Sequence, residues 1–184
     1  MSAVPRRLLT AEEFAALPSE GLRLELVRGE ITAMPPAFED HGEVAMLLGA
    51  MLATHVRQQG LGKTYAAETG FLIAQNPDTV RAPDFAFIQM SRLPAGGPAA
   101  RWVPVVPDLV GEIVSSGDRL TEVRDKVQMW LDAGVRLVWV VFPAQRVVEV
   151  WRPGQAERAL RAGDTLDGED VVPGFSVPAR EIVG

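Results

Sequence analysis

The chain has 184 residues, of which 47% are hydrophobic, and it contains no Cys. This length and composition predict one domain with a sizeable core, and they exclude a disordered chain, a disulfide framework, a thiolate metal site and a cysteine nucleophile. The formal net charge of −6 is opposite in sign to the basic footprint of most nucleic-acid-binding proteins. Carboxylates that hold a metal ion would contribute to this charge, however, and basic residues can gather on one face.

The N-terminal sequence MSAVPRRLLTAEEF contains neither a long apolar run nor a cleavage-like site, so we expect no signal peptide. No stretch approaches the roughly 18 apolar residues that a membrane-spanning helix requires. We therefore expect a soluble, cytoplasmic protein with no membrane partner. The absence of Cys fits a reducing compartment.

A short helix and a β-hairpin are predicted first. Thr10 and Glu13 match a capping box, which indicates a helix over residues 11–17. In residues 22–34, apolar and polar residues alternate on both sides of a Gly turn, as in a hairpin with one buried face. The residues expected on that face are Leu22, Leu24 and Leu26.

The next segment predicts a long helix followed by strands. Residues 40–59 carry apolar residues at helical spacing, and residues 64–74 and 82–88 resemble strands. Residues 91–107 are rich in Pro and Gly and are expected to form an exposed loop. The residues expected on the buried helix face are Val44, Leu47, Leu48, Met51, Leu52 and His55.

A strand–helix–strand unit follows. Residues 108–116 read as a buried strand and residues 118–134 as a second long helix, with Asp118 as its N-cap and Gly134 ending it. The uninterrupted apolar run at 135–142 predicts a strand that is buried on both faces. Such a unit should form a right-handed parallel crossover.

These elements predict an α/β (α+β) fold with a mixed central sheet, two long flanking helices and hairpins at both ends. We expect a single domain over residues 1–184. It would consist of an N-terminal helix and hairpin (1–36), a core (40–142) and a C-terminal β appendage (146–184), whose first strand pairs back as a hairpin.

Two acidic residues occupy unusual positions in this pattern. Glu112 lies in the middle of a strand that is otherwise predicted to be buried, where a carboxylate is costly unless it is paired or binds a metal. Asp84 follows Pro83 at the start of an apolar strand. If the two strands are neighbours, both acids could reach one cation. The alternatives are that Glu112 pairs with an arginine such as Arg124, and that Asp84 belongs to an ordinary Pro–Asp turn.

The type of metal can be narrowed from the available ligands. Hard cations take oxygen ligands, few protein carboxylates and several waters. His41 and His55 lie in no Cys- or His-rich zinc motif. Mg²⁺ or Mn²⁺ is therefore expected, either of which could polarise a phosphoryl group and activate water.

Lys126 is one of only two lysines, the other being Lys63, against sixteen arginines. In a chain that otherwise uses arginine, a lysine can be present because the chemistry needs an ammonium group, or it can be present by chance. On the predicted helix it lies roughly 80° from the centre of the apolar stripe and borders the buried face; a solvated lysine is the alternative. The stripe consists of Leu120, Val123, Val127, Trp130 and Leu131.

For three further polar residues, the alternation of apolar and polar positions predicts a solvent-exposed side chain. Glu25 occupies the polar phase of the hairpin, and His41 and Glu43 lie at the start of the first long helix. The sequence assigns no role to His41 or Glu43.

In order and spacing, several short motifs resemble the Uma-type family of bacterial "putative restriction endonucleases", within the PD-(D/E)XK nuclease superfamily. The motifs are ELVRGE, APDFAF, DLVGEIVSS and DKVQMWLDAGVRLVWVV, and the likeness extends from LTAEEF to VPGFSVPAREI. It implies a restriction-endonuclease-like fold with a catalytic set of Asp84, Glu112, Lys126 and Glu25. In that set, Asp84 and Glu112 would hold the metal.

This chain departs from the family pattern at three places. The superfamily lysine is expected two residues after the strand acid, where this chain has Val114, and Lys126 resembles the migrated lysine of this family. Trp130 stands where a Tyr is frequent, and Phe142 where an Asp is frequent.

The resemblance implies a metal-dependent endonuclease that hydrolyses DNA phosphodiester bonds with Mg²⁺ (or Mn²⁺), and a homodimer, because such enzymes often pair to cut two strands. Arg92, Arg101 and Trp102 in the loop could contact substrate or partner, unless the loop is an ordinary surface loop. Two other functions stay open: a catalytically inactive binding or scaffold protein that retains the fold, and a carboxylate–metal hydrolase of small phosphoesters. A salt-bridged Glu112 together with a Lys126 that points into bulk water would favour the scaffold, whereas convergence of Asp84, Glu112 and Lys126 on one cavity without a neutralising arginine would favour the enzyme.

Overall fold

The computed structural model describes residues 7–18, 21–34, 36, 38–95 and 101–184. Its helices are α1 (Ala11–Ala16), α2 (Glu39–Gln59), α3 (Leu120–Asp132) and α4 (Arg180–Val183), with short 3-10 turns η1 (Met90–Arg92) and η2 (Pro143–Gln145). The strands are β1 (Arg23–Val27), β2 (Glu30–Met34), β3 (Gly62–Ala66), β4 (Phe71–Ala74), β5 (Thr79–Arg81), β6 (Phe85–Gln89), β7 (Leu109–Ile113), β8 (Leu137–Phe142), β9 (Val147–Trp151), β10 (Arg158–Leu160), β11 (Thr165–Asp167) and β12 (Ser176–Pro178).

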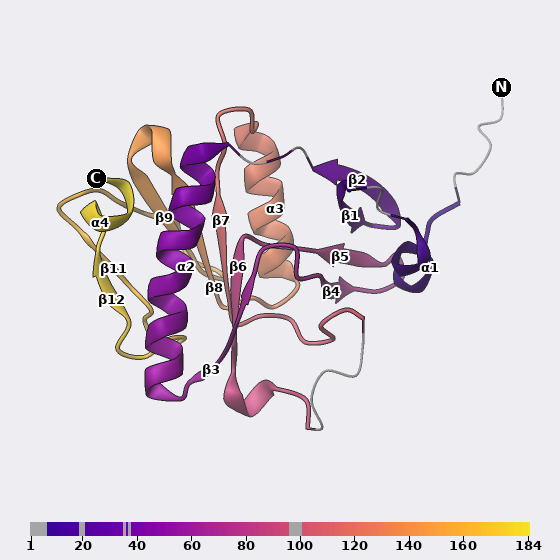
Figure 1. Ribbon diagram of the computed structural model, residues 1–184, viewed down its shortest axis with the longest axis horizontal. Coiled ribbons are helices and arrows are strands. Elements are labelled where there is room, and N and C mark those ends of the chain that lie inside the picture. Colours follow the sequence, from indigo (N-terminus) through magenta and orange to yellow (C-terminus); the bar gives the residue numbers. More distant parts are fainter. Residues whose placement is uncertain (1–6, 19–20, 35, 37, 96–100) are drawn as a thin grey trace.

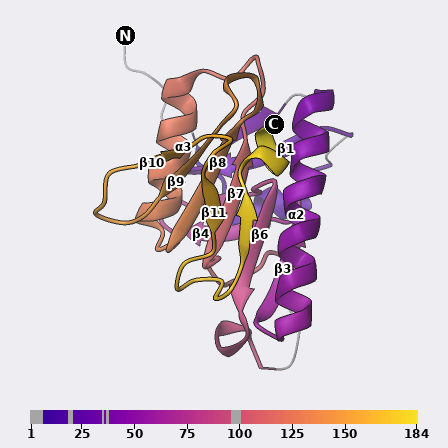
Figure 2. The same ribbon diagram turned by 90° about the vertical axis from the view of Figure 1, so that its left-hand side faces the viewer.

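A six-stranded sheet of order β10-β9-β8-β7-β6-β3 forms the centre of the fold (Figure 1). Strands β7 and β8 are parallel and are connected through α3, as predicted, while the other neighbouring strands pair antiparallel. Helices α2 and α3 cover opposite faces of this sheet (Figure 2). A four-stranded sheet of order β2-β1-β5-β4 lies next to α3, and β11 pairs with β12. The predicted mixed sheet with two long flanking helices is confirmed.

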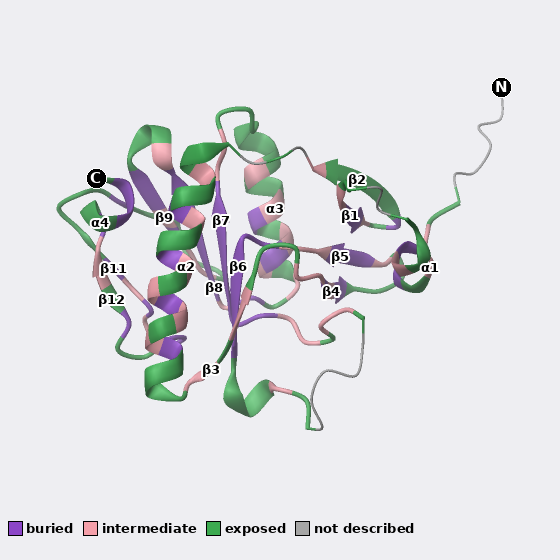
Figure 3. Ribbon diagram, in the orientation of Figure 1, coloured by how far each residue is buried: buried purple, intermediate pink, exposed green. Residues whose placement is uncertain are grey.

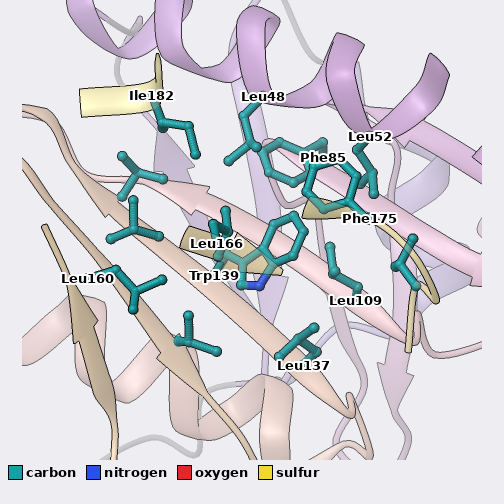
Figure 4. Close-up of a cluster of buried hydrophobic side chains, with 14 of the residues drawn as sticks. Leu48, Leu52, Phe85, Leu109, Leu137, Trp139, Leu160, Leu166, Phe175 and Ile182 are labelled. Carbon is teal, nitrogen blue, oxygen red and sulfur yellow. The ribbon is translucent and has the colours of Figure 1, made fainter. Parts of the chain in front are cut away.

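Strand β8 lies at the centre of the hydrophobic core and is buried along its whole length (Figure 3). Its alternate residues belong to two different apolar clusters, one under α2 and one under α3. Trp139 lies in the first cluster, close to Leu48 and Leu52 of α2 and stacked on Phe175 (Figure 4). Burial on both faces explains why the sequence of β8 is uninterruptedly apolar.

Helix α2 has the predicted position and begins one residue earlier. Its buried residues lie four positions apart, so they form a single row along one side of the helix. The predicted Leu47 lies beside that row and is exposed. The buried residues of the helix are Val44, Leu48, Leu52 and Val56.

Three predicted details are wrong. Residues 64–74 form two strands in different sheets, β3 and β4, because a turn at Glu68, which has a positive φ of 69°, separates them. Asp118 is not the N-cap of α3: Arg119 holds that position, and the Asp118 carboxylate accepts a hydrogen bond from the Ser115 backbone at 2.8 Å. Leu22 is 57% exposed because β1 begins only at the next residue.

The Pro- and Gly-rich loop is only partly exposed. Residues 96–100 lie outside the described residues, but the segment that follows them packs onto the body of the protein. Trp102 stacks on Phe14 with ring centroids 5.4 Å apart, and Val103 forms a β-bridge with Phe71. The second half of the loop is therefore part of the fold, because its apolar side chains cover the edge of the four-stranded sheet.

The C-terminal segment contributes to the same core as α2. Its buried apolar residues join the cluster on the α2 face of the central sheet. They are Leu160, Leu166, Val171, Val172, Phe175, Ala179, Ile182 and Val183. Among the described residues, no helix is both long and apolar enough to cross a membrane.

Gly111 in β7 allows the close packing of β6 on β7. A Cβ atom at this position would lie 2.0 Å from Cζ of the buried Phe85. We expect Gly111→Ala to lower the free energy of unfolding by about 1–3 kcal/mol, because the ring cannot move without disturbing the core. Urea denaturation measures the change.

The matched control is Gly163→Ala, at an exposed turn where a Cβ atom would meet nothing within 4 Å. This variant should stay within about 1 kcal/mol of the wild type. Equal stabilities of the two variants would contradict the packing argument.

Candidate active site

Asp84 and Glu112 lie on neighbouring antiparallel strands. Phe85 pairs with Gly111 in the β6–β7 register, so Asp84, one residue earlier, lies level with Glu112. The Asp84 backbone N–H donates to Gly111 O at 3.1 Å, and the Ile113 N–H donates to Asp84 Oδ2 at 2.7 Å. Both acids are buried, with exposures of 9% and 7%. The ordinary Pro–Asp turn is thereby disfavoured.

Glu112 is held by two side chains of the crossover helix. Lys126 Nζ donates to Glu112 Oε2, and Trp130 Nε1 donates to Oε1, both at 2.7 Å. Lys126 and Trp130 are four residues apart on α3 and therefore project from the same side of the helix. Within the described part of the chain no arginine pairs with Glu112. The alternative partner, Arg124, lies 3.6 Å from Glu149 instead.

Lys126 is directed into the molecule rather than into solvent. Its side chain is 17% exposed, and its Nζ also lies 4.0 Å from Glu25 Oε1. The scaffold alternative expected a salt-bridged Glu112 with this ammonium group in bulk solvent. Glu112 is salt-bridged, but to Lys126 itself, and the structure places the ammonium group at a cavity wall. The geometry therefore favours a chemical role for Lys126.

Glu25 is buried, contrary to the solvated side chain that the alternating pattern favours. Its Oε2 accepts from Arg81 Nη1 at 2.9 Å, and its Oε1 accepts from the Ala82 backbone at 3.0 Å. The polar face of β1 is covered because the four-stranded sheet packs against α3, where Arg81 contacts Met129. With its charge neutralised by Arg81, Glu25 is suited to orienting Lys126.

His41 is a member of the site that sequence reasoning missed. From the first turn of α2, its Nε2 lies 3.1 Å from Asp84 Oδ1 and its Nδ1 lies 3.1 Å from Ser115 Oγ. The available signal was the scarcity of histidine, because His41 is one of only two in the chain. Glu43, on the same helix turn, is exposed and does not line the cavity.

These side chains line one cavity of about 820 Å³ between the four-stranded sheet and α3. The cavity is bounded by His41, Asp84, Glu112 and Lys126 together with apolar and basic residues. The apolar residues include Phe14, Leu22, Leu24, Met34 and Phe38, and the basic ones are Arg23, Arg81 and Arg101. A concave, largely apolar space with a few converging polar groups is typical of a ligand site.

The two acids have pKa values pushed in opposite directions. Burial raises the pKa of Glu112 to about 7, and the charges of Asp84 and Glu25 act in the same direction against that of Lys126. Burial also acts to raise the pKa of Asp84, but the hydrogen bond and charge of His41 outweigh it and leave this pKa below its ordinary value. Divergent pKa values in a shared cleft are characteristic of functional sites.

The two cationic partners stay protonated more readily than usual. The hydrogen bond to Asp84 raises the pKa of His41 above 6.5. Burial acts to lower the pKa of Lys126, but the carboxylates of Glu112, Glu25 and Asp84 together raise it. Each acid in the cavity thus has a basic neighbour, His41 beside Asp84 and Lys126 beside Glu112.

The donor set fits a hard divalent cation that retains several waters. Asp84 and Glu112 offer oxygen ligands, and each oxygen accepts one hydrogen bond in the structure, which leaves a lone pair for a cation. Among the described residues, no group of three or more His, Asp or Glu is arranged to enclose a metal. Mg²⁺ is commonly bound through only one or two carboxylates.

The central sheet with its β7–α3–β8 crossover and the two acids, one directly before β6 and one on β7, define a protein of the restriction-endonuclease-like fold. A solved structure described as a putative nuclease belonging to DUF820, from Anabaena variabilis, shares this fold with a TM-score of 0.84 and 21% identity, covering 95% of this chain and 97% of that chain. The family model Uma2, described as "putative restriction endonuclease", matches residues 11–180, and the chain belongs to this family. No curated protein sequence matches the chain.

A pH-dependent stability follows from the pKa of Glu112. Because this pKa rises from 4.5 to about 7 on folding, the folded protein binds a proton that the unfolded chain releases, and stability falls as pH increases across that interval. Glu112→Gln cannot titrate. We expect the wild type to lose stability relative to Glu112→Gln between pH 4.5 and about 7, as measured by urea denaturation.

The exposed Glu43→Gln serves as the control, and its difference from the wild type should stay constant over the same pH range. A wild type that gains stability relative to Glu112→Gln as pH increases would contradict the raised pKa.

Proposed function

We propose that this protein is a metal-dependent endonuclease that hydrolyses DNA phosphodiester bonds at a site formed by Asp84, Glu112 and Lys126. The observation that carries the proposal is the convergence of these three groups, from two strands and a helix, on one cavity. Membership of a family described as restriction endonucleases supports nuclease activity.

Asp84 and Glu112 are the residues that would hold the cation, Mg²⁺ or Mn²⁺, in this proposal. When bound, such an ion supplies charge that polarises the scissile phosphate and makes water a better nucleophile. Asp84 is suited to this role because its pKa is lowered. Glu112 must release its proton to act as a ligand, so cation binding is expected to strengthen as pH increases through about 7.

Lys126 is proposed to orient the attacking water and to neutralise charge that grows on the phosphoryl oxygens. Its ammonium group is held between Glu112 at 2.7 Å and Glu25 at 4.0 Å, so its position is set before substrate arrives. Positioning and charge stabilisation are what phosphoryl transfer chiefly needs. Glu25 would act through Lys126, because its charge is already paired with Arg81 at 2.9 Å and its Oε1 lies 4.0 Å from the Lys126 Nζ.

DNA is the proposed substrate because of the family, and Arg23 and Arg101 in the cavity wall offer positive charge to its phosphates. Cleavage of both strands would require two sites, which makes a homodimer part of the proposal. The proposed location is the cytoplasm.

Plasmid nicking with Mg²⁺ or Mn²⁺ tests the proposal. We expect nicking that EDTA abolishes and that falls by about 100-fold or more in Asp84→Asn, Glu112→Gln and Lys126→Met. The first two remove a carboxylate that would hold the cation, and the third removes the positive charge that stabilises the transition state. Relaxed circles separated on agarose gels give the rate.

The chain offers matched controls for these variants. Lys63→Met alters the only other lysine, which is exposed on β3, and Glu43→Gln alters an exposed acid outside the cavity. Both should nick like the wild type. Nicking that persists in the Asp84 and Glu112 variants would reject the site.

Hydrolysis of small phosphodiesters is a second candidate, favoured by the size of the cavity. A volume of about 820 Å³ lies within the range of small-molecule sites. The discriminating measurement compares plasmid nicking with hydrolysis of bis(p-nitrophenyl) phosphate under the same metal concentration. Turnover of the small ester without nicking would favour this second function.

A further inference from the structure

We propose that His41 is a positioning residue of this site, which holds the Asp84 carboxylate in the orientation that cation binding requires. The inference rests on the proposed function, because it assigns Asp84 as a cation ligand. Nothing in the acid–lysine arrangement itself requires a histidine, and the residue comes from α2, an element that contributes no other group to the polar cluster.

The carboxylate of Asp84 is fixed at both oxygens. The Ile113 backbone N–H donates to Oδ2 at 2.7 Å, and His41 Nε2 lies 3.1 Å from Oδ1. The first contact comes from the sheet and cannot be removed by a side-chain substitution. Among the residues that the structure describes, the second is the one hydrogen bond from a side chain to this carboxylate, so His41 sets how its free lone pairs face the cavity.

His41 is itself held in place by a second contact. Its Nδ1 lies 3.1 Å from Ser115 Oγ, and the Ser115 backbone is fixed by Asp118 at 2.8 Å. Both ring nitrogens are therefore engaged, which sets the plane of the ring. Because Ser115 follows Ile113 by two residues, one short stretch of chain after β7 supports both sides of the Asp84 carboxylate.

The other histidine shows how the chain uses this side chain for structure alone. His55 lies on the same helix, packs edge-on against Phe175 and contacts Pro173 O through Nε2 at 2.9 Å, away from the cavity. The attachment of α2 to the sheet is already provided by its apolar row at Val44, Leu48 and Leu52. His41 is not needed to hold the helix.

Hydrogen-bond partners of metal-binding carboxylates and histidines affect the metal strongly. Loss of such a partner typically lowers metal affinity or activity by about 10- to 100-fold, because the ligand is no longer held in the orientation that binds the metal. We expect a loss of this size when the His41–Asp84 contact is removed.

The two ring nitrogens can be tested separately. The amide nitrogen of Gln reaches approximately the position of Nε2, and that of Asn approximately the position of Nδ1. His41→Gln can therefore keep the contact with Asp84, whereas His41→Asn keeps only the contact with Ser115. We expect Mn²⁺ affinity, measured by calorimetry without DNA, to fall by about 10- to 100-fold in His41→Ala and His41→Asn, and by less in His41→Gln.

Histidine NMR provides a readout that is independent of activity. With only two histidines, the ring nitrogens in ¹⁵N-histidine-labelled protein are easily assigned. We expect Asp84→Asn, and Mg²⁺ added to the wild type, to shift the His41 ring nitrogens and leave those of His55 unchanged. His55→Asn supplies the matched control, with unchanged Mn²⁺ affinity.

The outcomes separate the inference from the proposed function. Wild-type Mn²⁺ affinity in His41→Ala, or equal losses in the Gln and Asn variants, would overturn the positioning role even if Asp84→Asn abolishes nicking. A wild type that binds no Mn²⁺ would overturn the proposed function and the inference with it. Thermal denaturation of each variant distinguishes a loss of affinity from a loss of folded protein.

Discussion

The site depends on two buried carboxylates that lie side by side at the junction of β6 and β7. Asp84 and Glu112 would repel one another there, and burial disfavours the charged form of each. The protein places one basic side chain against each acid, His41 against Asp84 and Lys126 against Glu112. Asp84 consequently keeps its charge, while Glu112 holds a proton up to about neutral pH.

Each partner arrives on a separate element, so the site forms only when the whole fold is assembled. The β7–α3–β8 crossover lays α3 against the sheet and brings Lys126 onto Glu112. Helix α2, on the opposite face, brings His41 to Asp84. The four-stranded sheet supplies Glu25 together with its counter-ion, Arg81. The Glu25 carboxylate therefore acts on Lys126 without being an unpaired buried charge.

Much of the fold was predictable because the main signals are local. The apolar run of β8 and the helical spacing of α2 each lie within one element, and each was located correctly. Glu112 was recognisable as the charged residue of a buried strand. The errors concern places where a neighbour changes the environment: Leu22 lies outside the hairpin pairing, and Trp102 is covered by Phe14.

The sequence by itself determined the buried strands, the two long helices, the parallel crossover and the positions of Asp84, Glu112 and Lys126 within them. Only the tertiary structure decided which groups face one another. His41 and Asp84 are 43 residues apart, and Glu25 and Arg81 are 56 apart. Periodicity reports whether a residue lies on an apolar or a polar face of its own element, but it contains no information about which distant element covers that face.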